Sequence, residues 1–280
     1  MKTQFFVFAC FFAAISFLTA CSTKGQTGTT EQESLTQYVD PLIGTAHCRW
    51  FHFAPGALPF GMAKPASATN ASAGNKSGWE ATGYDYRNTS IEGFPCLHEF
   101  QVGGIVLMPT NGKLKTVPGA VNSTGEGYRS AFNHANEVVQ PGYYSVLLKD
   151  YGIKAELTAT KRVAYQRFTF PANEQSHVLF DIGNRQGESG EVVDAEVSIS
   201  DEGLIEGWVK TLPVYSDKYQ SGATITMYFS AEMDRKSDAV GTFKKTEIFA
   251  DQKQAKGVGA GVYLTYKTEE GDRVTAVSYT

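Results

Sequence analysis

The chain has few cysteines, and this scarcity limits the chemistry that they can carry. Only four occur among its 280 residues. Cys10 lies within an apolar N-terminal run and Cys21 closes that run, which leaves Cys48 and Cys96 for the rest of the chain. These two cysteines could form one disulfide or remain two buried thiols, and the sequence does not decide between the two. The absence of paired C-x-x-C spacing argues against a structural zinc site.

Positive charge is also sparse. The 25 lysines and arginines are outnumbered by 29 aspartates and glutamates, which gives a formal net charge of -4. No basic stripe runs along the chain, so we expect no nucleic-acid partner.

Long helical patterns are missing as well, and no internal repeat is present. After residue 140, no apolar stripe with helical spacing extends over three turns. The chain instead shows short runs rich in Val, Leu, Tyr, Phe and Thr, separated by polar or proline-containing breaks. These runs predict strands at 143–149, 153–160, 163–170, 178–182, 195–200, 204–211, 223–231, 244–250, 261–267 and 273–279. So many strands in one domain predict an all-β fold, a large antiparallel β-sandwich. The strand-like pattern continues to the last residues, which indicates a chain cut at a domain boundary.

The N-terminus is typical of a bacterial lipoprotein signal. Lys2 supplies a positive charge, residues 5–18 are almost continuously apolar, and Leu18-Thr19-Ala20 leads into Cys21. This pattern predicts a signal peptide at 1–20 and a lipid on Cys21 that anchors the chain to a membrane. A plain secretory signal or an uncleaved anchor is the alternative, and the Leu-Thr-Ala-Cys ending favours lipidation. Residues 21–35 then form a flexible tether and residues 36–280 the folded domain.

The most polar and aromatic stretch runs from Gly78 to Pro109. Its side chains include an indole, phenols, carboxylates and an imidazole between glycines, a composition that argues against an ordinary core strand. We therefore expect a loop-rich platform, with the apolar run 105–108 returning the chain to the core. Aromatic rings next to carboxylates suit a sugar, because rings take its C–H faces and carboxylates take its hydroxyls. The platform residues that we expect to contact a sugar are Trp79, Glu80, Tyr84, Asp85, His98 and Glu99.

Five stretches, in this order, resemble the N-terminal domain of glycoside hydrolase family 92, the exo-acting α-mannosidases. They are Tyr38–Pro41 with Ile43–Thr45; Pro55–Met62; Gly78-Trp79 with Gly83–Tyr86 and Ile91–Phe94; Phe132–His134 with Glu137 and Pro141–Tyr144; and Glu156–Thr160 ending in Phe170-Pro171. The resemblance implies a galactose-mutarotase-like supersandwich with a loop-rich N-terminal part. Complete members follow this sandwich with a helical (α/α)6 barrel, and they are inverting and calcium-dependent enzymes, often from gut Bacteroidetes.

The family places both catalytic carboxylates in the helical domain, which these 280 residues do not contain. We therefore assign no catalytic residue and no metal ligand here, and we expect most calcium ligands outside this chain. By the same resemblance, Trp79 packs against the terminal mannose of the glycan and Glu80 takes the acidic position after it. His98 corresponds to the second histidine of a family motif, whereas Cys96 stands where many members have the first.

Each of these residues also has a plainer interpretation. Trp79 could be a core indole, His98 a buried histidine, and Asp85 the cap of a turn, which is the reading that we favour for Asp85. We expect His134 and Glu137 to brace a turn rather than to bind a metal. Glu80 and Glu99 could also be taken for a catalytic pair, which the family resemblance argues against.

Two functions follow from these observations. The first is the sugar-site-contributing domain of a lipid-anchored exo-α-mannosidase that acts on mannose-containing glycans. The alternative is a non-catalytic glycan-binding lipoprotein at the cell surface. The residue after Cys21 is Ser22 and not the aspartate that is associated with retention in the inner membrane. We therefore expect the protein in the outer membrane, on its periplasmic or external face.

Overall fold

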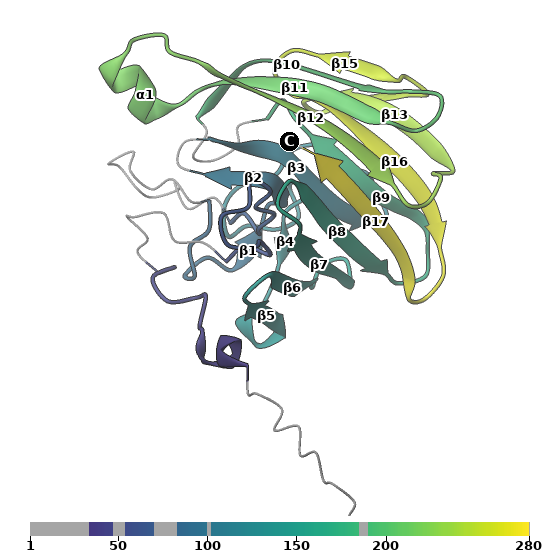
Figure 1. Ribbon diagram of the computed structural model, residues 1–280. Coiled ribbons are helices and arrows are strands. Elements are labelled where there is room, and N and C mark those ends of the chain that lie inside the picture. Colours follow the sequence, from purple (N-terminus) through teal and green to yellow (C-terminus); the bar gives the residue numbers. More distant parts are fainter. Residues whose placement is uncertain (1–33, 47–53, 70–82, 100–101, 185–189, 280) are drawn as a thin grey trace, which may run out of the picture. The chain divides into compact units, whose positions relative to one another are not determined.

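The computed structural model describes residues 34–46, 54–69, 83–99, 102–184 and 190–279. The chain divides into two units, Met1–Leu35 and Thr36–Thr280. Nearly all of the first unit, with the predicted signal, the tether and Cys21, lies outside the described residues. The second unit is an antiparallel β-sandwich, which confirms the predicted fold class (Figure 1).

The larger sheet has nine strands in the order β15-β10-β11-β12-β17-β8-β7-β6-β5. In chain order, their bounds are β5 Glu137–Gln140, β6 Tyr143–Leu148, β7 Ile153–Ala159, β8 Val163–Phe170, β10 Glu191–Ile199, β11 Ile205–Leu212, β12 Ile225–Met233, β15 Gln254–Lys256 and β17 Asp272–Tyr279. All of their pairings are antiparallel.

The smaller sheet has six strands in the order β14-β13-β16-β9-β3-β2. Their bounds are β2 Phe94–Glu99, β3 Val102–Asn111, β9 Asn173–Asp181, β13 Ala239–Lys244, β14 Glu247–Ala250 and β16 Ala260–Thr268. The remaining elements are the short pair β1 Ser90–Ile91 and β4 Ser130–Ala131, the 3-10 turns η1 Leu35–Tyr38 and η2 His134–Asn136, and the helix α1 Val214–Tyr219.

The core lies between the two sheets. Strand β7 alternates buried and more exposed residues, as expected of a strand with one face on the core and one on solvent. Phe180 of β9 stacks on Phe229 of β12, with ring centroids 6.3 Å apart, so the two sheets meet through aromatic side chains. Phe168 of β8 lies against Phe94 of β2 in a tilted arrangement, with ring centroids 6.1 Å apart.

The expectation that residues 78–109 form a loop-rich platform was wrong for their second half. Residues 94–99 and 102–111 are strands β2 and β3 of the smaller sheet. The glycines do not break β3, because its pairing with β2 keeps one register from Phe94–Leu107 to Glu99–Val102, with only Cys96 and Ile105 outside the paired positions. Gly104 and Ile105 take positive φ values there, 140° and 57°.

The single strand expected at 244–250 was also wrong. Strand β13 ends at Lys244 and β14 begins at Glu247, and the two form a hairpin. Lys245 has a φ of 54°, in the left-handed region that turns use. Neither glycine nor proline marks this turn, so the sequence gives no sign of it.

None of the described helices has both the length and the apolar character needed to cross a lipid bilayer.

Candidate functional site

Of the six residues predicted to contact a sugar, two lie outside the described residues, two are described by their backbone pairing and two are described with their side chains. Trp79 and Glu80 belong to segment 70–82, which lies outside the described residues. His98 and Glu99 end strand β2, and their backbones pair with Gly103 and Val102 of β3. Tyr84 and Asp85 are described in full, and both side chains are buried.

The segment that carries Trp79 and Glu80 begins and ends at one closed neck. The backbone N–H of Thr69 donates to the carbonyl of Gly83 at 2.7 Å. The hydroxyl of Thr69 in turn accepts a hydrogen bond from the Asp85 N–H at 2.8 Å. Residues 69 and 83, fourteen positions apart, are therefore held together at the base of the segment.

Directly after the neck, Tyr84 joins a buried cluster around the carboxylate of Glu137. The Tyr84 hydroxyl donates to this carboxylate at 3.0 Å, and the Tyr144 hydroxyl donates to it at 2.7 Å. Burial, together with the negative charge of Glu137, raises the pKa of both tyrosines. Both phenols thus stay protonated and act as donors, which lets Glu137 be buried as a hydrogen-bonded carboxylate.

His134 completes this cluster. Its Nδ1 lies 2.5 Å from the Glu137 carboxylate and its Nε2 lies 2.8 Å from the backbone carbonyl of Tyr86. The imidazole also stacks on the Tyr86 ring, with centroids 3.7 Å apart. The predicted brace between His134 and Glu137 is thereby confirmed, and it ties η2 and β5 to residues 84–86.

Asp85 caps a turn, in agreement with the favoured interpretation of the sequence. Its carboxylate accepts from the Arg87 backbone N–H at 2.9 Å and forms an ion pair with the Arg87 guanidinium. A sugar contact by Asp85 or by Tyr84 stays a prediction.

A buried ion pair, which the sequence did not reveal, lies next to the neck. The guanidinium of Arg129, wholly buried, lies 2.5 Å from the Glu92 carboxylate. It also donates to the carbonyls of Thr69 and Ser90, each at 3.3 Å. Arg129 therefore fixes the neck to strand β1. Its partners are 37 to 60 residues away in the sequence, a separation at which no local pattern could have identified it.

Together these contacts form a rigid base for segment 70–82. Glu137 and Glu92, the buried carboxylates of this base, are occupied by tyrosines, a histidine and an arginine. These contacts hold the backbone on either side of segment 70–82 in place.

Cys96 is a free, buried thiol within the described part of the chain. Its sulfur accepts hydrogen bonds from Ser278 and Gln166 of the larger sheet, at 3.0 and 3.2 Å. Burial raises the pKa of the thiol to about 12, so it remains protonated and inert. Cys48 lies outside the described residues.

Comparison with known proteins gives a consistent result. The profile of the glycosyl hydrolase family 92 N-terminal domain matches residues 38–277. The family GH92 α-mannosidase BT3965 from Bacteroides thetaiotaomicron, solved in complex with mannoimidazole, is 25% identical with a TM-score of 0.77. The match covers 88% of this chain and 32% of that one. The chain therefore spans about a third of the length of this solved relative.

A second solved structure, the family GH92 inverting mannosidase BT2199 from the same organism, is 20% identical with a TM-score of 0.64. The match covers 87% of this chain and 31% of the BT2199 chain. At this sequence identity, the similarity supports the fold alone. No curated protein sequence matches the chain.

Proposed function

The chain belongs to glycosyl hydrolase family 92, as its N-terminal domain, and from this premise we propose that it contributes the sugar-facing wall of an exo-α-mannosidase. The enzyme would be inverting, would depend on calcium and would act on mannose-containing glycans. The family match over residues 38–277 carries the proposal. The Thr69–Gly83 neck adds support, because it gives the segment with Trp79 and Glu80 a fixed base.

In this proposal the catalytic acid and base come from a helical domain outside these 280 residues. An inverting glycosidase needs one carboxylic acid on the leaving oxygen and one carboxylate on the attacking water. Trp79 would pack against the non-reducing mannose, and Glu80, His98 and Glu99 would bind its hydroxyls. Tyr84 and Asp85, which follow the neck in the chain, complete the predicted set.

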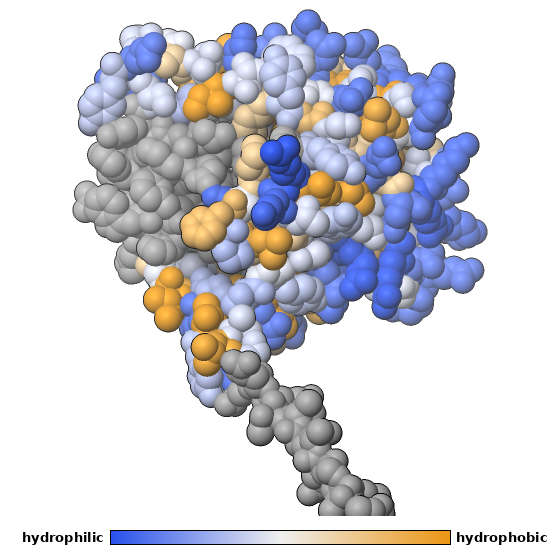
Figure 2. Space-filling view, viewed as in Figure 1, coloured by the Kyte–Doolittle hydropathy of each residue, from blue (hydrophilic) through white to orange (hydrophobic). Residues whose placement is uncertain are grey.

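Exposed apolar side chains support docking against such a domain. Among the described residues, sixteen large apolar side chains are exposed, and six of them lie in segments 38–46 and 54–62. Apolar surface gathers over this N-terminal part of the described chain (Figure 2). Solvent-exposed apolar surface of this kind is typical of an interface.

The calcium requirement rests on the family alone. In the part of the chain that the structure describes, no group of three or more His, Cys, Asp and Glu side chains could hold a metal ion. The described residues therefore do not fit a calcium site, and we derive no catalytic step from the ion.

We also propose that the chain is an exported lipoprotein of the outer membrane, anchored through Cys21. The apolar run that ends in Leu18-Thr19-Ala20-Cys21 supports this. Labelled palmitate should be incorporated by the wild-type chain and not by Cys21→Ser; equal incorporation by both chains would refute lipidation at Cys21.

The decisive experiment measures hydrolysis of α-linked mannobiose by the purified chain with calcium, with and without a chelator. We expect no turnover but weak mannose binding, which Trp79→Ala abolishes. The control is Tyr165→Ala, which removes an exposed aromatic ring from strand β8 and should leave mannose binding intact. Chelator-sensitive release of mannose by this chain alone would contradict the placement of the carboxylates and return attention to Glu80 and Glu99.

A further inference from the structure

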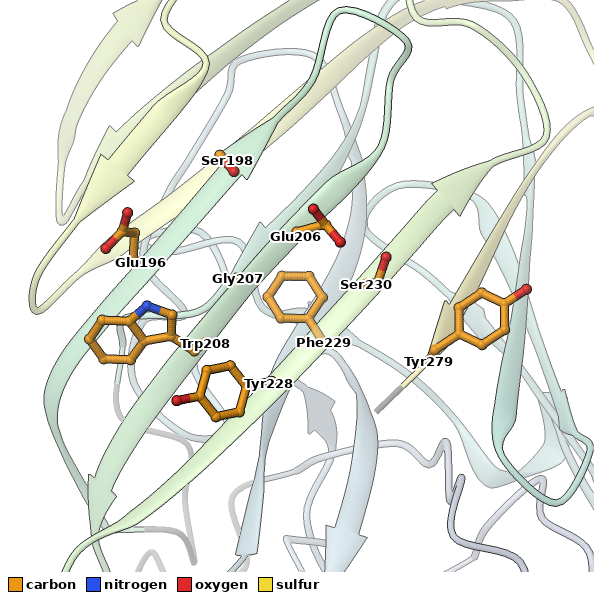
Figure 3. A pocket seen from close by; sticks show the side chains of 9 residues that line it. All are labelled: Glu196, Ser198, Glu206, Gly207, Trp208, Tyr228, Phe229, Ser230 and Tyr279. Carbon is orange, nitrogen blue, oxygen red and sulfur yellow. The ribbon is translucent and has the colours of Figure 1, made fainter.

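A second surface of the sandwich has the composition of a carbohydrate site. It is a groove of about 540 Å³ across strands β10, β11, β12 and β17 of the larger sheet (Figure 3). Its lining residues are Glu196, Ser198, Glu206, Gly207, Trp208, Tyr228, Phe229, Ser230 and Tyr279.

The strand register places Glu196, Ser198, Glu206, Trp208, Tyr228, Ser230 and Tyr279 on the outer face of the sheet, whereas Phe229, opposite Gly207, points to the core. Val197, Val209 and Ala231 are buried and point to the core. Residues adjacent to them along each strand point the opposite way, since side chains alternate. Trp208 lies directly opposite Tyr228, so an indole and a phenol stand side by side on neighbouring strands. Tyr228 is 68% exposed, and its ring offers an open apolar face.

A row of polar side chains runs parallel to these aromatic rings. Glu206 lies between Ser198 on one neighbouring strand and Ser230 on the other, and Ser230 lies opposite Tyr279. The row is two residues from the aromatic pair along the strands, about 7 Å. Within the described residues, the Glu206 carboxylate and the Tyr228 and Tyr279 hydroxyls have no hydrogen-bond or ion-pair partner.

The charges of the groove exclude an anionic ligand. Its lining contains two glutamates and, among the described residues, neither lysine nor arginine. Glu196 accepts a hydrogen bond from Gln254 at 2.8 Å and pairs with Lys256 at 3.4 Å, so the positive charge of Lys256 is already neutralised. A nucleic acid, a phosphate or an anionic lipid surface would be repelled.

We propose that this outer-face groove binds a neutral polysaccharide chain, independently of the mannose contact at Trp79. The rings of Trp208 and Tyr228 take the C–H faces of pyranose units. Glu206, Ser198 and Ser230 bind the hydroxyls at the ring edges. A dry protein partner fits less well, because it would bury the Glu206 carboxylate with no cation beside it.

The test is affinity electrophoresis of the full chain in gels that contain yeast α-mannan, galactomannan or polygalacturonate. A Trp79→Ala background removes the proposed mannose contact, so that retardation reports the groove. We expect retardation in at least one neutral gel and none in the polygalacturonate gel. Trp208→Ala should weaken binding roughly tenfold or more, since stacking aromatics dominate such contacts.

Two further variants separate binding from folding. Tyr228→Ala removes a largely exposed ring and should also weaken retardation while leaving the circular dichroism spectrum unchanged. Tyr165→Ala is the matched control, because this exposed tyrosine lies on the same face, on β8, outside the groove. It should bind like the parent chain.

A spectroscopic readout locates the ligand. The chain has three tryptophans, so Trp50→Phe with Trp79→Ala leaves Trp208 as the only indole. Its emission should shift when the retarding polysaccharide is added. Absence of retardation in every neutral gel would overturn the proposal. So would retardation of the Trp208→Ala and Tyr228→Ala chains that equals that of the parent chain. Self-association that Trp208→Ala abolishes, without sugar binding, would overturn it too and would identify the face as a protein contact.

Discussion

Asp181 is a wholly buried carboxylate at the end of strand β9. It accepts hydrogen bonds from the Tyr128 hydroxyl and from the Asn184 side-chain amide, both at 2.6 Å. These donors favour the charged form, but burial outweighs them and raises the pKa of Asp181 to about 6. The group thus holds its proton in the folded protein over a range where the unfolded chain has lost it.

The raised pKa gives a stability prediction with a definite sign. Between about pH 4 and pH 6 the folded state binds more protons than the unfolded state, so this group's contribution to the unfolding free energy falls as pH rises. At about 1.4 kcal/mol per pKa unit, the fall is ~3 kcal/mol. Asp181→Asn cannot titrate, so the wild type should lose stability relative to this variant over that range.

Urea unfolding of both proteins at pH 4, 5, 6 and 7 measures the difference. Glu202→Gln, which removes a carboxylate from an exposed turn, is the control and should follow the wild type. A wild-type-minus-variant difference that stays constant from pH 4 to 7 would contradict the assignment.

At the scale of single elements, Gly93 shows how a glycine can be required by its surroundings. Its φ is 147°, and a Cβ added there would lie 2.3 Å from Val106 Cγ1 and 3.0 Å from the Leu107 carbonyl oxygen. Gly93→Ala should therefore force apart the start of β2 and strand β3. We expect a cost of roughly 3 kcal/mol from overpacking and backbone strain together.

Gly112→Ala is the matched control for Gly93→Ala. Its φ of 73° is also positive, but a Cβ added there meets nothing within 4 Å. Only the backbone term remains, about 1 kcal/mol. Chemical denaturation of both variants should show a clear gap between them, and equal losses would mean that the contact with Val106 is relieved without cost.

The same elements show how far sequence patterns reach. Strand β8 lies at the predicted residues 163–170, because its alternation of buried and more exposed side chains is visible in the sequence. The hairpin of β2 and β3 was missed, because glycines usually weaken strands, whereas Gly103 and Gly104 here pair with His98 and Leu97 in the register of the other pairs. The turn at Lys245 was missed because its left-handed backbone conformation falls on a lysine, a residue type that does not indicate a turn.

The candidate site was predictable only where its contacts join residues that are close in the sequence. The His134–Glu137 brace joins residues three apart, a spacing that the sequence displays. The contact from Tyr84 to Glu137 spans 53 residues, and the Arg129–Glu92 pair spans 37. Such pairs depend on how β1, β4 and β5 come together, which no local pattern encodes.

At the scale of the whole molecule, the sandwich separates its two proposed carbohydrate surfaces by element. Trp79 and Glu80 lie in the segment between residues 69 and 83, which the neck closes. Trp208 and Tyr228 lie in the middle of the larger sheet, on its outer face. Since no side chain belongs to both sets, a substitution in one should leave the other unaffected.

The exposed apolar side chains of segments 38–46 and 54–62 lead to a prediction about assembly. Phe60 is wholly exposed although it is aromatic, and its φ is 59°. It follows Pro59 in a turn closed by the Gly61 N–H and the Leu58 carbonyl, 3.0 Å apart. Asparagine tolerates this left-handed conformation better than phenylalanine does. Phe60→Asn should therefore keep the unfolding free energy or raise it by up to ~1 kcal/mol.

The same substitution should reduce self-association of the isolated chain, because an exposed ring that has no contacts within its own domain is free to pack against a second molecule. Sedimentation velocity over a range of concentrations measures this, with Ile248→Asn on strand β14 as a control that alters an exposed apolar side chain outside these two segments. If Phe60→Asn instead lost more than about 1 kcal/mol of stability, the ring would have to pack within its own domain, and its role as a docking residue would be refuted.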